Sequence, residues 1–529
     1  MTLHRVLGLG VATLLLCGTA ASAKTLVYCA EGSPENFTPA LNTTGTSFDA
    51  ARPALDRLIE FKPGTTDIRP GLAESWDIAP DGKTITFHLR KGVKFGATKG
   101  FKPTRDFNAD DVLFSFGRQY DPANPYNKIG GGKYDYYNDM DLPKLLTSIE
   151  KKDDYTVVFH LSEPNVTILA DMAMDFAAIQ SKEFADAMLK AGTPEQFDQV
   201  PVGTGPFIFS SYQKDAVIRF KANPNYWNGR PPMDELVFAI TPDPTARYSK
   251  LKTNECQIIP YPRPADLPEM QKDPELTVQS QPGLNIGYYS FNATKPPFDK
   301  KEVRQALSMA IDRGAIVKDV YLGAGQQAKN LIPPTMWAYN DAVKDYPFDP
   351  AKAKEMLAAA GVKTPLDVDL WYMPVQRPYN PDSKRIGEMM QADLAKVGVN
   401  AHLVSYEWGE YRKRLSAGED TTAQYGWTGD NGDPDNFFFL LSCPDGKPAQ
   451  NNATKWCDAT FDADLVKARQ IADQAERKKI YDEMQVIQHD NAPMLTLAHS
   501  VVFMPMRKTV TGYTMSPLGT HEFDHVDVK

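Results

Sequence analysis

The sequence predicts an α/β fold with more than one domain, and three observations lead to this expectation. The chain has 529 residues, too many to pack around a single hydrophobic core. Its first half is mixed and rich in strand-like segments, whereas its second half alternates helices and strands. Within the second half, residues 367–430 read as strand, helix, strand, helix and strand, a succession typical of a parallel sheet.

The composition is that of an acidic, well-packed globular protein. Hydrophobic residues make up 42% of the chain, with 7 Trp, 23 Tyr and 26 Phe, which argues against disorder. The formal net charge of −9 gives no support to a nucleic-acid partner.

The first 23 residues are typical of a secretory signal peptide. Arg5 precedes an apolar run, and the small residues Ala21–Ala23 predict cleavage after Ala23. A membrane anchor and a lipoprotein signal are the alternatives. The apolar run is short for a spanning helix, and Cys17 follows Leu16 where a lipidation site wants a small residue. We therefore expect an exported, soluble protein.

Four cysteines remain after cleavage, and an even number in an exported protein suggests two disulfides. Three connectivities are open. Pairing Cys443 with Cys457 closes the shortest loop and leaves Cys29 with Cys256. Free thiols remain an alternative. No C-x-x-C occurs, so the cysteines do not suggest a zinc site.

The elements of the first half follow from local patterns. Asp110 and Asp111 suit the first turn of a helix, where carboxylates are favoured. Gly361 is a good C-terminal stop for a helix. Strands are expected at residues 24–30, 84–95 and 155–162 and as a pair within 205–227, and helices at 301–321 and 351–361.

Two loops stand at the carboxyl end of the predicted parallel sheet, where ligands bind in such folds. The strand at 367–373 leads into a loop that holds Arg377, which the following Pro378 keeps extended. After a helix at 382–398, a strand at 401–408, a short helix and a strand at 422–427, the second loop holds Asp430. One cation and one anion at one end of a sheet suit a zwitterion. The alternative is that Arg377 and Asp430 pair with each other or with solvent.

The motifs of catalysis and metal binding are incomplete. "HEFDH" (521–525) matches the zinc-protease pattern, but it lies in a terminal tail where no helix is expected. "DGKT" (81–84) lacks the first glycine of a phosphate loop, and no G-x-S-x-G occurs. Asp430, Asp433 and Asp435 do not have calcium-loop spacing, although an irregular metal site stays open. We expect no enzyme, no cofactor and no metal, and a buried position for the aromatic run 437–439.

Several stretches in order resemble the family 5 extracellular solute-binding proteins, the peptide, nickel and opine receptors of ABC importers. The first is "RPGLAESWDIAPDGKTITFHLRKGVKF" (69–95), followed by "FNADDVLFSF" (107–116). "PVGTGPF" (201–207), "NPNYWNGRPPMDEL" (223–236) and "PPFDKKEVRQALSMAIDR" (296–313) come later. The resemblance covers essentially the whole mature chain.

This resemblance implies a two-lobed periplasmic binding protein of type II, cluster C, with hinge strands and an extra subdomain. The chain would leave the first lobe near 280–285 and return near 498–504. The first lobe would be 24–282 plus 501–529, with the subdomain inserted at about 55–205. The second lobe would be 283–500.

Within the family, "MPVQRPYNPD" (373–382) and "YGWTGDNGDPDNFF" (425–438) are similar to the dipeptide-binding branch. The resemblance implies that Arg377 binds the peptide carboxylate and Asp430 the α-ammonium. The four mature cysteines also fall where that branch has its two disulfides. Weaker implied contacts are Thr43, Tyr379, Trp427, Thr428 and Gly429, with Thr44 as an alternative to Thr43.

The expected function is therefore a monomeric receptor that delivers dipeptides to an inner-membrane ABC permease. Tripeptides remain open. Alternatives within the family are a longer peptide, haem or a metal chelate. A secreted peptidase that uses the acidic loop is the remaining alternative from another class.

Overall fold

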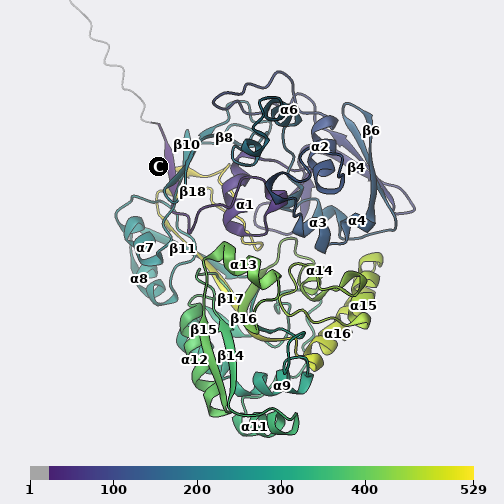
Figure 1. The fold of residues 1–529 in the computed structure, drawn as a ribbon. Helices are drawn as coiled ribbons and strands as arrows, with labels where there is room; N and C mark the ends of the chain where they lie inside the picture. Colours follow the sequence, from purple (N-terminus) through teal and green to yellow (C-terminus); the bar gives the residue numbers. More distant parts are fainter. Residues whose placement is uncertain (1–22) are drawn as a thin grey trace, which may run out of the picture.

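The computed structural model describes residues 23–529 and has two lobes, one above the other in Figure 1. We call the upper one the N-terminal lobe and the lower one the C-terminal lobe. The predicted signal peptide lies almost entirely outside the described residues. Among residues 23–529, no helix is long and apolar enough to cross a membrane.

The N-terminal lobe contains two four-stranded sheets, as the strand-rich first half predicted. The first has the order β1-β10-β9-β8, with β1 parallel to β10. The second is antiparallel, with the order β4-β5-β7-β6. Their bounds are β1 Thr25–Tyr28, β8 Phe207–Gln213, β9 Val217–Ala222, β10 Glu235–Ala239, β4 Ala73–Ile78, β5 Thr84–Leu89, β6 Leu146–Asp153 and β7 Thr156–Leu161. In β5 alternate side chains are buried, which is why its alternating sequence forms a strand.

Helices of the N-terminal lobe begin where the sequence supplies caps. Helix α2 (Ala109–Tyr120) starts at Asn108, whose side chain accepts a hydrogen bond from the backbone N–H of Asp110. Asp111 completes a capping box, so the acidic run is a helix start as predicted. The other helices of this lobe are α1 Gly45–Ala51, α3 Asp135–Asp139, α4 Leu142–Leu145, α5 Ile168–Asp171, α6 Lys182–Lys190, α7 Pro244–Lys252 and α8 Leu267–Lys272.

The C-terminal lobe contains the parallel unit expected from residues 367–430. Strand β14 (Leu366–Trp371) pairs in parallel with both β15 (Val399–Val404) and β16 (Thr422–Thr428). The sheet is mixed overall, because β12 (Asn285–Phe291) runs antiparallel to β16. Helix α12 (Ser383–Lys396) begins at Asp382, which caps the backbone N–H of Arg385. The remaining helices are α9 Lys301–Ala310, α11 Pro350–Ala359, α13 Trp408–Ser416, α14 Asp435–Phe438, α15 Ala459–Gln470 and α16 Gln474–Asn491.

The single helix predicted for 301–321 is wrong, because the segment is broken into three pieces. Helix α9 ends at Ala310, and Asp312 then caps a new start at α10 (Arg313–Ile316) by accepting from the backbone N–H of Ala315. A π-helix, η7 (Val317–Tyr321), follows. A side chain that caps a helix favours a chain break at its own position, and helical periodicity alone does not reveal it.

The two lobes are joined by two antiparallel segments. The long strand β17 (Met494–Arg507) pairs with β11 (Leu276–Pro282) near the N-terminal lobe and with β12 in the C-terminal lobe. The change of partner falls between Pro282, which faces Val501, and Gly287, which faces Ala498. These segments include the two at which the family resemblance implied that the chain crosses, and the domain limits stay a prediction.

Two disulfides lie at the expected pairs. Cys29 and Cys256 have Cα atoms 5.8 Å apart, and Cys443 and Cys457 have Cα atoms 5.6 Å apart. The first joins the end of β1 to a segment far along the chain, and the second closes a short loop in the C-terminal lobe. The alternative of free thiols is therefore wrong.

Candidate functional site

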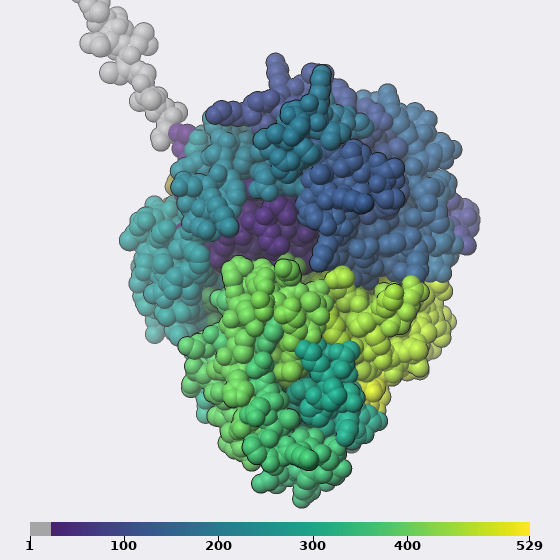
Figure 2. Space-filling view, viewed as in Figure 1, coloured from purple at the N-terminus to yellow at the C-terminus, as the bar shows by residue number. Residues whose placement is uncertain are grey.

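A cavity of about 100 Å³ lies between the lobes and is lined from both sides. Figure 2 shows the purple N-terminal segment recessed between the blue part of one lobe and the green part of the other. In Figure 1, α1 and α3 of the N-terminal lobe face α13 and α14 of the C-terminal lobe across this gap. Both Arg377 and Asp430, predicted from separate loops, line the cavity.

Asp430 follows strand β16 and turns its carboxylate toward the opposite lobe. Its Oδ2 accepts a hydrogen bond of 2.7 Å from the hydroxyl of Tyr136 on α3. Its backbone N–H donates to Oδ1 of Asn436 at 2.7 Å. No Lys or Arg within residues 23–529 forms an ion pair with it. Burial raises the pKa of the Asp430 carboxyl to about 7. The hydrogen bond from Tyr136 lowers this pKa, and the negative charge of Asp175 raises it.

The two neighbouring aspartates of this loop have different surroundings. Asp433 receives two hydrogen bonds of 2.8 Å from Arg477, and Asp435 receives bonds of 2.7 and 3.1 Å from Arg469. These bidentate pairs neutralise both carboxylates inside the protein. Of the three acidic residues of the loop, only Asp430 is left to meet a cation from outside.

Arg377 lies on a loop that the protein holds in a defined shape. Arg377 and Asn380 exchange backbone hydrogen bonds of 3.1 and 3.0 Å, and the Asn380 side chain donates to Oε1 of Gln424 on β16 at 3.0 Å. The hydroxyl of Tyr321 donates to the carbonyl oxygen of Tyr379 at 2.6 Å. The loop is thus tied to the sheet, so the position of the guanidinium is set by the fold.

The guanidinium of Arg377 is buried but incompletely bonded. Its contacts to Glu31 Oε1, Thr46 Oγ1 and the carbonyl oxygen of Gln376 measure 3.5, 3.4 and 3.3 Å, all long for a charged donor. The ring of Trp408 lies 5.2 Å from its central carbon. Arg377 therefore does not pair with Asp430, and it has donors to spare for a carboxylate.

Aromatic rings form the walls between the two charged groups. The lining includes Phe48, Tyr136, Tyr379, Trp408, Tyr425 and Trp427. The indole N–H of Trp427 donates to Oδ1 of Asn436 at 3.1 Å, the atom that also accepts from Asp430. The indole N–H of Trp408 has no hydrogen-bond partner within residues 23–529.

Of the five weaker contacts implied by the resemblance, the structure places four in the cavity wall. Thr43, Tyr379, Trp427 and Thr428 line the cavity, and so does Thr44. Gly429 does not line it. A Cβ at Gly429 would come within 2.6 Å of the ring of Phe437, so this glycine allows close packing behind the cavity wall.

The "HEFDH" motif has no metal-binding arrangement, because its segment is not a helix. His521 instead lines the cavity, with its Nδ1 3.1 Å from the Tyr513 hydroxyl and its Nε2 3.7 Å from Asp49. Within residues 23–529, no group of three His, Cys, Asp or Glu is placed to hold a metal ion. The aromatic run 437–439 is fully buried, as predicted.

Sequence reasoning missed several residues of the site, including Arg52, Tyr136 and Asp175. Arg52 donates to Asp175 at 2.7 Å and pairs with Asp49. Burial by itself would raise the pKa of Asp175, but the charges of Arg52 and Arg57 outweigh it and lower this pKa. These residues come from separate segments of the N-terminal lobe, and no local pattern in the sequence links them.

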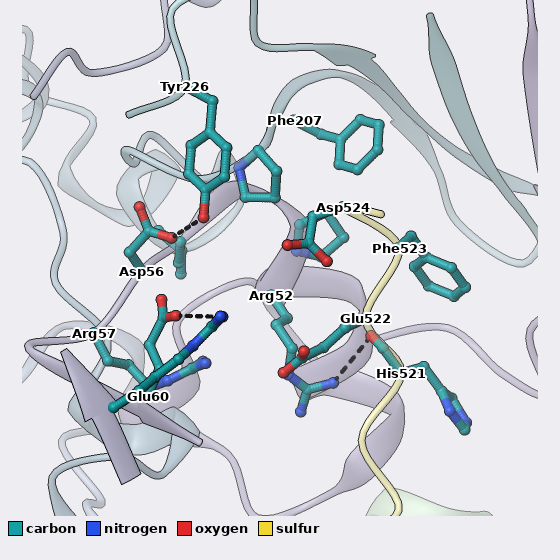
Figure 3. Close-up of a pocket in the computed structure, with 14 residues that line it drawn as sticks. Arg52, Asp56, Arg57, Glu60, Phe207, Tyr226, His521, Glu522, Phe523 and Asp524 are labelled. Atoms are coloured by element: carbon teal, nitrogen blue, oxygen red, sulfur yellow. Dashed lines mark hydrogen bonds and ion pairs between the residues drawn. The ribbon is translucent and has the colours of Figure 1, made fainter. Parts of the chain in front are cut away.

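A second cavity, of about 40 Å³, lies on the other side of Arg52 (Figure 3). There Asp56 accepts hydrogen bonds from Thr204, Tyr226 and Trp227, at 2.7, 3.2 and 2.9 Å. Arg52 also donates to the carbonyl oxygen of His521. The donors of Arg52 are therefore used within the protein, whereas the contacts of Arg377 are all 3.3 Å or longer.

Comparison with known proteins identifies the family of this chain. Residues 67–449 match the profile described as bacterial extracellular solute-binding proteins, family 5 middle. The chain is 54% identical to the dipeptide-binding protein of Escherichia coli (strain K12) over 99% of this chain and 98% of that protein. It is 48% identical to heme-binding protein A of Haemophilus influenzae, covering both chains completely.

Two solved structures have the same fold. The dipeptide-binding protein of Pseudoalteromonas sp. SM9913, in complex with Met-Leu, superposes with a TM-score of 0.92 and 40% identity over 96% of this chain and 100% of that one. An ABC transporter-associated periplasmic binding protein of Helicobacter pylori, in complex with the peptide STSA, gives 0.91 and 36% over 95% and 98%. This chain belongs to the family 5 bacterial extracellular solute-binding proteins.

Proposed function

We propose that this protein is the receptor of an ABC importer and captures dipeptides by their two charged ends between its lobes. It is a binding receptor and not an enzyme, like the family to which it belongs. One observation carries the proposal: a carboxylate without a cationic partner and an incompletely bonded guanidinium line the same inter-lobe cavity. The similarity to dipeptide-binding proteins supports it.

The chemistry of a free dipeptide matches these two groups. Its α-ammonium and α-carboxylate are separated by about 7 Å of extended chain. Asp430, with Tyr136 behind it, would bind the ammonium. Arg377 would bind the carboxylate through two parallel hydrogen bonds, with the ring of Trp408 5.2 Å from the central carbon of the guanidinium. Asp430 then gains the cationic partner whose absence makes its burial costly, and Arg377 gains an anion closer than Glu31, which lies 3.5 Å away.

Recognition of the ends leaves the side chains of the peptide free to vary. The walls are aromatic rings, which offer large contact areas without demanding a given polar group. Ordered water can fill the space beside a small side chain. The receptor would therefore accept many dipeptide sequences and discriminate mainly by length.

Closure would be a hinge motion at the two crossing segments. Strand β17 is continuous from one lobe to the other, so rotation is confined to a few residues near Pro282 and Val501. A dipeptide that touches both lobes stabilises the closed arrangement. We propose that this form docks on the inner-membrane permease.

The location and the division of the chain complete the proposal. Export would proceed through a signal peptide cleaved after Ala23, and the receptor would act as a monomer in the periplasm. The lobes would be 24–282 plus 501–529, with a subdomain at about 55–205, and 283–500. The family description, which is extracellular, supports export.

Blocking either end of a dipeptide is expected to abolish most of its binding. Each block removes one charge, which leaves Asp430 or Arg377 buried against an uncharged group, at a cost of about 100-fold in affinity. Calorimetry with Ala-Ala, acetyl-Ala-Ala and Ala-Ala amide measures this. Equal affinity for free and blocked peptides would contradict the proposal. Haem, a nickel–histidine chelate and a nonapeptide test the other ligands, and product analysis by mass spectrometry tests peptidase activity.

Peptide binding is expected to release a proton below neutral pH. The pKa of Asp430 is about 7 because burial disfavours its charge, and a bound ammonium favours the charged form, so the pKa falls on binding. Affinity should therefore drop by up to about tenfold per pH unit below pH 7. It should drop again above about pH 8, where the peptide amine loses its proton.

Calorimetry in buffers of different ionisation enthalpy counts the protons released. The count should approach one near pH 6 and cross zero between about pH 7 and pH 8, above which the peptide amine takes up a proton on binding. The Asp430→Asn variant should release no proton near pH 6. A wild-type protein that releases no proton near pH 6 would show that Asp430 is already charged before the ligand arrives.

A further inference from the structure

A second inter-lobe chamber, of about 270 Å³, adjoins the dipeptide cavity. Tyr425 lines both spaces. The chamber wall also includes Glu35, Lys133 and Asp135 from the N-terminal lobe and Arg412 from α13. The dipeptide cavity borders two other spaces, of about 40 and about 30 Å³, which hold no more than a few water molecules. Of these three neighbouring spaces, the chamber has room for an amino-acid residue.

Arg412 lines the chamber and contacts a residue of the dipeptide cavity. Its guanidinium crosses from the C-terminal lobe, donates to Glu35 Oε1 at 2.7 Å and contacts the hydroxyl of Thr43. Thr43 lines the dipeptide cavity, whereas Glu35 lines the chamber. The Arg412 side chain is 15% exposed. Burial disfavours the charge of Arg412, but Tyr425 and Glu35 raise its pKa. The Arg412 side chain is therefore charged, and it is hydrogen-bonded to the opposite lobe.

We propose that Arg412 is a specificity-determining residue that excludes tripeptides by closing the passage to this chamber. The inference rests on the proposed function and adds a selection by length. A third residue lengthens an extended peptide by about 3.5 Å. If Asp430 and Arg377 keep hold of both ends, the longer chain has to bow sideways. The chamber behind Arg412 is the space that a bowed residue would enter.

Displacement of Arg412 has a cost that only longer ligands bear. The side chain would lose Glu35 and Thr43, and its buried charge would need new partners. A dipeptide leaves these contacts in place. The same contacts hold the lobes together, so a dipeptide benefits from them while a tripeptide breaks them. Loss of Arg412 should therefore weaken dipeptide binding and strengthen tripeptide binding if Arg412 selects by length, but should weaken both if it only holds the lobes together.

The test is calorimetry of Ala-Ala and Ala-Ala-Ala with the wild type and the Arg412→Ala variant. The ratio of the tripeptide Kd to the dipeptide Kd is expected to fall by at least about tenfold in the variant. The tripeptide binds more tightly, and the dipeptide slightly less tightly because a lobe contact is lost. Equal weakening of both peptides would overturn the proposal, since it would leave Arg412 as a latch alone.

Two further variants guard against a change in folding. Lys413→Ala lies on the same helix and the same chamber wall, with its side chain 76% exposed, and is expected to leave the ratio within about twofold. Glu35→Gln removes the partner of Arg412 at an exposed position and should lower the ratio in the same direction. A ratio unchanged in both Arg412→Ala and Glu35→Gln would also overturn the proposal.

Two additional ligands separate this inference from the proposed function. Trp-Trp tests whether the chamber takes a large side chain, and a gain for Trp-Trp without a gain for Ala-Ala-Ala would contradict the length filter. Acetyl-Ala-Ala amide tests recognition of the ends in the wild type. If the wild type rejects the blocked peptide while Arg412→Ala leaves the ratio unchanged, the length filter fails and the dipeptide receptor stands.

Discussion

The Asp430→Asn variant is expected to bind dipeptides about 100-fold to 1000-fold more weakly than the wild type. Removal of one charge from a buried pair costs several kcal/mol, because the other charge stays buried without its partner. Here that other charge is the peptide ammonium. The amide keeps the size of the side chain and can still accept from Tyr136, so the loss reports the charge.

The same variant is expected to be more stable than the wild type without ligand. The Asp430 carboxylate is enclosed and has no cationic partner within residues 23–529. Its pKa in the folded state is raised above the unfolded value, so the destabilisation sets in above about pH 4, where the unfolded carboxyl ionises, and is complete above about pH 7. The increase in melting temperature should therefore be present at pH 8 and absent near pH 4, where the unfolded carboxyl is also protonated.

Asp433→Asn is the matched control, with the same substitution three residues further along the loop. Asp433 is paired with Arg477, so its replacement leaves a buried guanidinium unpaired and should lower the melting temperature. Acetyl-Ala-Ala provides the second control, because it has no ammonium and should bind wild type and Asp430→Asn about equally. Wild-type affinity for Ala-Ala in Asp430→Asn would refute the assignment.

The Arg377→Ala variant is expected to lose dipeptide affinity by a similar factor, about 100-fold or more, for the opposite end of the ligand. The guanidinium is the cavity-lining cation whose own contacts are all 3.3 Å or longer, and therefore the one with free donors. Arg377→Lys should recover little, because an ammonium cannot form the two parallel hydrogen bonds of a guanidinium.

The Arg377→Ala variant should be less stable than the wild type, whereas Asp430→Asn should be more stable. Loss of Arg377 leaves Glu31, whose side chain is 8% exposed, without its cation, so the melting temperature of the ligand-free protein should fall. The double variant with Glu31→Gln should regain part of that stability but not the affinity. Ala-Ala amide lacks the carboxylate and should bind wild type and Arg377→Ala alike; a large loss for this ligand too would point to a general distortion of the loop.

Local elements were predictable because they depend on neighbours a few residues away. Asn108 and Asp111 close the start of α2, and Asp382 caps α12, both through contacts within one turn of helix. The strands β14, β15 and β16 were recognisable because their apolar runs alternate with an amphipathic helix. The break at Asp312 was missed because a cap within a periodic segment does not disturb the hydrophobic pattern.

The sequence by itself determined the α/β class, the parallel unit and the two loops that present Arg377 and Asp430, since strand order and loop position follow from periodicity. Only the tertiary structure decided which charges remain for a ligand. Asp433 and Asp435 are neutralised by Arg477 and Arg469, and Arg52 is satisfied by Asp175. These partners are separated by long stretches of chain, and the strength of a charge pair depends on distance and burial in space, which a single sequence does not contain.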